Sequence, residues 1–80
     1  MAEDLDEMAN AVRTAIQEDP TISDPTRILV SARKAGPLFR KETVIQLEGT
    51  VRNDVEARKA GELARRRAPN ARIENNLKAE

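Results

Sequence analysis

The chain has 80 residues, with 14 basic and 14 acidic side chains and therefore a formal net charge of zero. It contains no cysteine and no histidine, which excludes disulfides and thiolate metal sites and removes the commonest general base and neutral metal ligand. Ser23 and Ser31 then have no obvious activating partner. We expect one domain, residues 1–80, that is not an enzyme and uses no metal or cofactor.

The charges are unevenly distributed along the chain. Up to Asp24 there are seven acids and one base, and from Pro25 onward thirteen bases and seven acids, so the two parts carry formal charges of −6 and +6. No apolar run approaches the roughly 20 residues that span a membrane. The start, MAEDLDEM, is acidic rather than basic and then apolar, so we expect no signal peptide.

The first predicted element is an amphipathic helix over residues 3–18. Its apolar residues recur at spacings of three and four, and its acids fall in the first turn, where the helix dipole favours negative charge. Pro20 disfavours a helical Asp19 and ends the helix, and Ile22 is expected to be an apolar anchor in the connector. The apolar face consists of Leu5, Met8, Ala9, Val12, Ala15 and Ile16.

Two strands are predicted next, over residues 27–34 and 43–51. In the second strand, one face is apolar and the other is more polar. The apolar face consists of Ile45, Leu47, Gly49 and Val51, and the other face of Val44, Gln46, Glu48 and Thr50. Gly49 lies on the apolar face, and glycine weakens a strand unless another backbone must come close. We therefore expect Gly49 to face a close neighbour, which we assign to the backbone or a small residue of the second helix.

The second helix is predicted over residues 52–70, with Asn53 or Asp54 as its cap. Pro69 ends it, and Asn70 can take the left-handed conformation. Residues 71–79 form a third strand. The buried stripe of the helix is expected to consist of Ala57, Ala60, Leu63, Ala64 and Ala68.

These elements predict an α+β fold in the order αββαβ, a three-stranded sheet with both helices packed on one face. The first two strands are antiparallel, and the third runs in the direction of the second. The pattern leaves open whether the third strand lies beside the second or the first. We expect the core to bring together Val12, Leu47, Leu63 and Ile73.

Two strand motifs and the alanine-rich helix between them carry a family resemblance. The motifs, Leu-x-Gly-x-Val and a variant of Val-x-Asn-x-Leu, consist of Leu47, Gly49 and Val51, and of Ile73, Asn75 and Leu77. On these motifs the chain resembles the BON domain, a bacterial osmotic-stress and nodulation module of the cell envelope, over nearly its whole length. The resemblance implies a structural Gly49 and a non-catalytic module that contacts phospholipid membranes or bridges envelope components. It also implies the periplasm or cell envelope, whereas the expected lack of a signal peptide leaves the cytoplasm as the alternative.

The turn RKAGPLFRKET, residues 33–43, is several residues longer than the hairpin usual in BON domains. It holds the only aromatic residue, Phe39. Either its tip docks onto an anionic membrane surface or an apolar groove, or Phe39 folds back as a lid on the core. We expect the bases of this turn and of the second helix end to gather at one end of the domain, where the acidic start of the first helix partly neutralises them. The helix arginines also have a purely structural interpretation, since bases stabilise a helix C-terminus. The candidate contact residues are Arg33, Lys34, Leu38, Phe39, Arg40, Lys41, Arg65, Arg66 and Arg67.

Three classes of function are compatible with these patterns. The first is binding to an anionic phospholipid surface or an envelope protein. The second is a protein-interaction module or a homo-oligomer formed through a sheet edge. Nucleic-acid binding is not favoured, because the net charge is zero and stacking aromatics are lacking.

Overall fold

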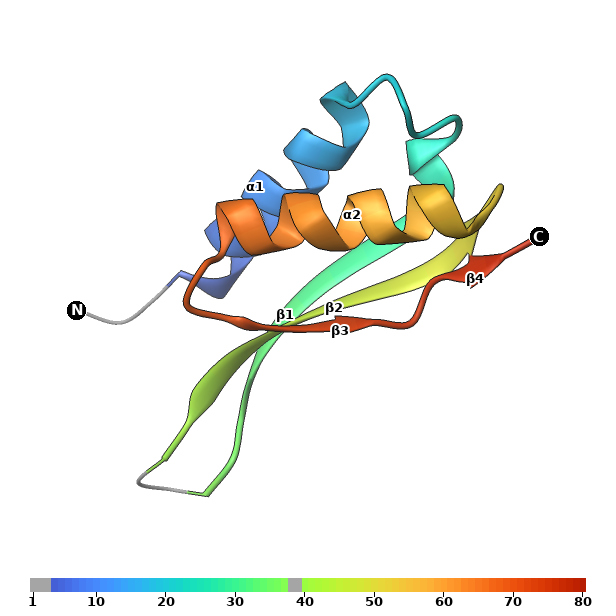
Figure 1. Cartoon of the computed structure of the whole chain (residues 1–80). Helices are drawn as coiled ribbons and strands as arrows, with labels where there is room; N and C mark the ends of the chain where they lie inside the picture. The colour runs from blue at the N-terminus through green and yellow to red at the C-terminus, as the bar shows by residue number, and fades with distance from the viewer. Residues whose placement is uncertain (1–3, 38–39) are drawn as a thin grey trace.

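The computed structural model describes residues 4–37 and 40–80. Two helices lie over one face of a sheet, in the α+β order expected (Figure 1). The expected third strand is two short strands instead of one. The helices are α1 (Leu5–Glu18) and α2 (Asp54–Arg67), with a 3₁₀ turn η1 (Pro25–Arg27), and the strands are β1 (Ile28–Ala35), β2 (Glu42–Val51), β3 (Arg72–Asn75) and β4 (Lys78–Ala79).

Asp4 and Asn53 begin the two helices as N-caps. The Asp4 carboxylate accepts a hydrogen bond from the Glu7 backbone N–H at 3.1 Å, and the Asn53 amide oxygen accepts from that of Glu56 at 3.0 Å. Such side-chain acceptors satisfy N–H groups that have no partner inside a helix. The first helix therefore begins at Leu5, two residues later than the predicted start.

The left-handed Asn70 is a prediction that the structure contradicts. No described residue other than glycine has a positive φ. The helix already ends at Arg67, and the Ala68 N–H donates to the Ala64 carbonyl at 2.9 Å. The Ala71 N–H then donates to the Ala68 carbonyl at 3.0 Å, so a tight turn leads into β3 without a left-handed residue.

The sheet has the order β1-β2-β3, with β2 in the centre. β1 and β2 are antiparallel, and β3 is parallel to β2 with Ile73 opposite Ile45. The third strand therefore lies beside the second, which the sequence pattern had left open. β4 pairs with β2 further along, where Lys78 lies opposite Thr50.

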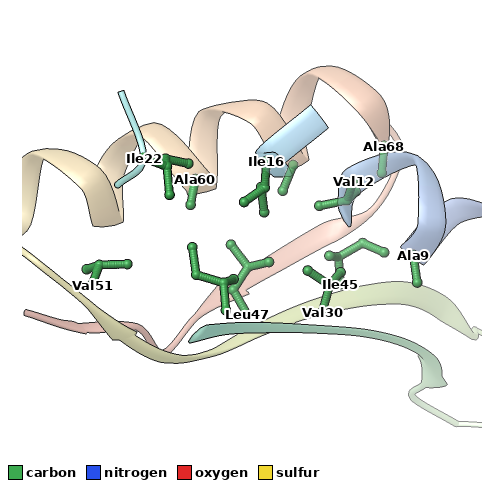
Figure 2. Close-up of a cluster of buried hydrophobic side chains, with 12 residues drawn as sticks. Ala9, Val12, Ile16, Ile22, Val30, Ile45, Leu47, Val51, Ala60 and Ala68 are labelled. Atoms are coloured by element: carbon green, nitrogen blue, oxygen red, sulfur yellow. The ribbon is translucent and has the colours of Figure 1, made fainter. Parts of the chain in front are cut away.

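The core lies between the sheet and both helices (Figure 2). Val12 of α1 and Leu47 of β2 are fully buried, and Leu63 and Ile73 are half-buried and pack against the same cluster, as expected. Ile22 is buried as well, which confirms it as the apolar anchor of the connector. The small residues Ala60, Ala64 and Ala68 are the buried part of the α2 stripe.

Gly49 allows the chain to pass very close to itself. Its φ is +117°, and a Cβ atom placed on it would lie 2.0 Å from the Arg27 carbonyl oxygen. The expected close neighbour is therefore a backbone, but it belongs to the segment entering β1 rather than to α2. The reason is the register, which places Ile28 directly opposite Gly49.

Asn75 holds α2 onto the sheet. Its side-chain amide donates to the Ala57 carbonyl in α2 at 2.8 Å, and its Oδ1 accepts from the Leu77 N–H at 3.2 Å. Gly61 makes room for this contact, since a Cβ there would lie 2.9 Å from the Asn75 amide nitrogen. A glycine inside a helix lowers stability by about 1 kcal/mol relative to alanine. At Gly61 the absence of a side chain leaves room for the hydrogen bond from Asn75 to the Ala57 carbonyl.

Asp19 joins the end of α1 to α2. Its carboxylate accepts from the Thr21 N–H at 2.8 Å and also from the Thr21 hydroxyl, and Lys59 Nζ lies 3.8 Å from its second oxygen. The hydrogen bonds from Thr21, and then the Lys59 charge, lower the pKa of Asp19 below its ordinary value of 3.8. Both interactions favour the ionised carboxylate.

We predict that Gly49→Ala lowers the free energy of unfolding by about 2 to 4 kcal/mol, because the methyl group meets the Arg27 carbonyl and the positive φ is strained. Chemical denaturation measures this change. The neighbouring, exposed Glu48 provides the control, since Glu48→Ala should alter stability by no more than about 0.5 kcal/mol. Equal midpoints for the two variants would contradict the close approach.

We predict that Asp19→Asn lowers stability at neutral pH and that its deficit disappears in acid. Because the pKa of Asp19 is lowered by folding, its contribution is present above its ordinary value of 3.8 and is lost as the pH falls through the folded value. Denaturation midpoints of wild type and variant should therefore converge below about pH 4. Glu18→Gln, at the exposed neighbouring residue, is the matched control; a gap that is the same at pH 7 and pH 2.5 would contradict the assignment.

Candidate functional site

The β1–β2 hairpin projects beyond the layer of helices (Figure 1). We call its outer part, residues 33–37 and 40–43, the hairpin arm. The last strand pair is Ala35 with Glu42, and the Arg40 N–H donates to the Pro37 carbonyl at 2.9 Å. The arm contributes to an elongated molecule with extents of 39 × 20 × 17 Å. Leu38 and Phe39 lie outside the described residues, so docking by this pair and its alternative as a core lid both stay predictions.

The four bases of the arm fall into two pairs. Arg33 donates to the Gln46 and Glu74 side-chain oxygens, both at 3.1 Å, and Lys34 Nζ donates to the Thr43 hydroxyl at 2.8 Å. These two bases are therefore engaged with the sheet. Arg40 and Lys41 are exposed, and neither forms an ion pair among the residues that the structure describes.

The three arginines of α2 occupy its last turn and are exposed. α2 ends toward the end of the molecule from which the arm projects, and α1 begins there too (Figure 1). Arg65, Arg66 and Arg67 stand on the helix layer, whereas Arg40 and Lys41 stand on the arm. The sequence therefore correctly placed both basic groups toward one end, but the structure distributes them over two separate elements.

A shallow groove runs along the outer side of α1. It has a volume of about 530 Å³ and is lined by Glu7, Asn10, Ala11, Thr14, Glu18 and Arg67. Arg67 of α2 thus shares this surface with Glu7 from the first turn of α1. The acidic start of α1 therefore lies at the same end as a base of α2, but no ion pair between these two residues is formed, so the expected neutralisation stays a prediction.

The sheet face that the helices leave uncovered carries a polar network. The Arg33 guanidinium crosses the central strand to Glu74 of β3, and Arg72 Nη1 lies 3.5 Å from a Glu42 oxygen. Val44 belongs to this face by its register between Arg33 and Arg72, yet it is only 1% exposed. Long charged side chains commonly cover apolar surface with their aliphatic parts, so we attribute the burial of Val44 to these two arginines.

The free edge of β1, expected to serve oligomerisation, is partly covered. Arg13 of α1 donates through Nη2 to the Val30 carbonyl at 2.9 Å. An edge strand pairs with another chain through such groups, and this acceptor is already engaged. Leu29 on the uncovered face is nevertheless 66% exposed.

Sequence reasoning missed a buried carboxylate at the start of α2. Glu56 is 6% exposed, and its oxygens accept from the Ser23 hydroxyl at 3.0 and 3.3 Å and from the Arg52 N–H at 3.5 Å. The adjoining pocket of about 270 Å³ also contains Arg27, which pairs with Glu80. The signal was present as Asn53-x-x-Glu56, the spacing of a capping box. These contacts make Glu56 a structural acceptor that ties the connector to α2.

Neither a metal-binding cluster nor a membrane-spanning helix is present within residues 4–37 and 40–80. There, no three potential ligand side chains come together as a metal site. No helix of this part is long and apolar enough to cross a bilayer.

In comparisons with known proteins, no family model matches the chain and no curated protein matches it. The resemblance to BON domains therefore stays a prediction.

We predict that Glu56→Gln lowers the free energy of unfolding by about 1 to 3 kcal/mol, because it removes a charged acceptor from buried hydrogen bonds. Urea denaturation measures the change. Glu62→Gln, an exposed position on the same helix, is the matched control and should leave the midpoint unchanged. A Glu56→Gln protein as stable as wild type would show that the carboxylate charge is not needed there.

Proposed function

We propose that this chain is a non-catalytic binding module that attaches to anionic phospholipid surfaces through the hairpin arm. The observation that carries the proposal is the exposure of Arg40 and Lys41 at the end of an arm that projects away from the helices (Figure 1). A projecting pair of bases can approach a flat charged surface without the rest of the domain interfering. The resemblance to BON domains supports the same function and extends the proposal to the bacterial cell envelope.

The expected attachment is weak and reversible. A base near an anionic bilayer surface contributes about 1 kcal/mol, and this attraction falls off within one Debye length, roughly 10 Å at 0.1 M salt. Arg33 and Lys34 add positive charge further back on the arm while they stay bonded to the sheet. Binding should therefore require anionic lipid and should decline steeply with salt.

Sedimentation with vesicles tests this function. The wild-type domain should bind vesicles of phosphatidylglycerol and phosphatidylcholine but not phosphatidylcholine alone. Arg40→Ala with Lys41→Ala removes two bases worth about 1 kcal/mol each, so the affinity should fall by roughly 30-fold.

The control variant is Arg65→Ala with Arg66→Ala, which removes the same charge from the end of α2. It should keep most of the binding. If this control loses binding while the arm variant retains it, the surface lies at the helix end instead. If wild type binds neither kind of vesicle, the proposed function is wrong.

A further inference from the structure

Among the described charges that form no ion pair, two exposed groups of opposite sign lie on different elements. Arg40 and Lys41 stand on the arm, and Glu7 and Glu18 stand on α1. Among the described residues, none of these four side chains forms an ion pair, whereas Arg33, Arg27, Arg72 and Lys59 all do. Opposite charges that cannot meet within one molecule can meet between two.

The acidic pair belongs to a surface with a receptive shape. Glu7 and Glu18 lie near the two ends of the groove along α1, and Ala11 and Thr14 lie between them. Eleven residues of helix separate the two carboxylates, about 16 Å along the axis at 1.5 Å per residue. The small side chains between them leave a shallow floor, so a partner can come close to the helix while its bases approach the carboxylates.

The basic pair belongs to an element that fits such a surface. β1 and β2 run together as a two-stranded ribbon as far as Ala35 and Glu42, and Arg40 and Lys41 follow at its end. The antiparallel strand pairing holds the arm away from the helix layer of its own molecule (Figure 1). Its bases are therefore held away from the groove of their own molecule and are accessible to other molecules.

We propose that the hairpin arm of one molecule docks, through Arg40 and Lys41, onto the groove along α1 of a second copy of this chain. The two surfaces are different, so the contact is heterologous. The first copy keeps its groove free for a third molecule, and the second copy keeps its arm free. Such contacts build head-to-tail chains or rings rather than a two-fold dimer.

The contact is electrostatic and exposed, which determines its properties. Exposed ion pairs are individually weak and are screened by salt. Arg67 at the groove also repels the incoming bases and limits the affinity. Self-association should therefore appear at high protein concentration and low ionic strength, with mean mass rising continuously with concentration.

Analytical ultracentrifugation of the full chain tests the proposal. The mean mass should rise with concentration at about 0.02 M salt and return to the monomer value at about 0.5 M, where the Debye length is only a few Å. Arg40→Glu with Lys41→Glu gives an arm variant, and Glu7→Lys with Glu18→Lys gives a groove variant. Each variant alone places like charges on both surfaces, and self-association should weaken by more than about tenfold.

Mixing the two variants is the decisive measurement. The positive arm of the groove variant then meets the acidic groove of the arm variant, and the other two surfaces are complementary as well. The mixture should regain association that neither protein shows alone. Circular dichroism and thermal unfolding of each variant establish that loss of association is not loss of folding.

The control carries Arg65→Glu with Arg66→Glu, which changes the net charge as the arm variant does but leaves arm and groove lining intact. It should associate like wild type. Loss of association in this control, monomeric wild type at low salt, or a mixture that stays monomeric would each overturn the proposal. Vesicle binding is a separate readout, because the groove variant keeps the basic arm and should still bind anionic lipid.

Discussion

Every part of this fold depends on the burial of one face of β2. The strand lies between β1 and the β3–β4 segment, and its residues Ile45, Leu47 and Val51 form, together with Val30 of β1, the floor of the core beneath the helices (Figure 2). A domain of this size buries only about 60% of its unfolded surface, so one continuous cluster must hold all elements. Gly49 interrupts the apolar series where the chain entering β1 comes close, and the register of β1 places Ile28 opposite it.

Much of this arrangement could be predicted from the sequence, because the spacing of apolar residues shows which face of each helix or strand is buried. The apolar spacing of α1, the alternation in β2 and the small residues of α2 each mark a face that must be covered, and the structure covers them as expected. The neighbour of Gly49 was assigned incorrectly for a physical reason. Periodicity shows that a backbone must approach but not which one, since that depends on the strand register.

The candidate site was predictable in part, for the same reason. Local sequence marks bases beside a turn, but it does not show which of them bind back to their own sheet. Arg33 reaches across the central strand β2 to Glu74, a residue 41 positions away, and no local pattern indicates that contact. The sequence pattern does not mark Glu56 as buried, because Ser23, the partner that accounts for its burial, lies 33 positions earlier. In both cases the decisive contact is distant in sequence.

The ion pairs show how the charged side chains of this chain are used. Pairs such as Asp19 with Lys59 and Arg33 with Glu74 use charges to connect different elements of the body. The described charges that these pairs leave over include Arg40 and Lys41 at the end of the arm, Glu7 and Glu18 on the outer side of α1, and the arginines in the last turn of α2. A surface charge without a partner adds little to folding stability, because it is fully solvated, but it keeps its full attraction for an external charge. The paired charges therefore join elements of the domain, whereas our proposals for binding rest on exposed charges that have no such partner, on an arm that the helices do not cover.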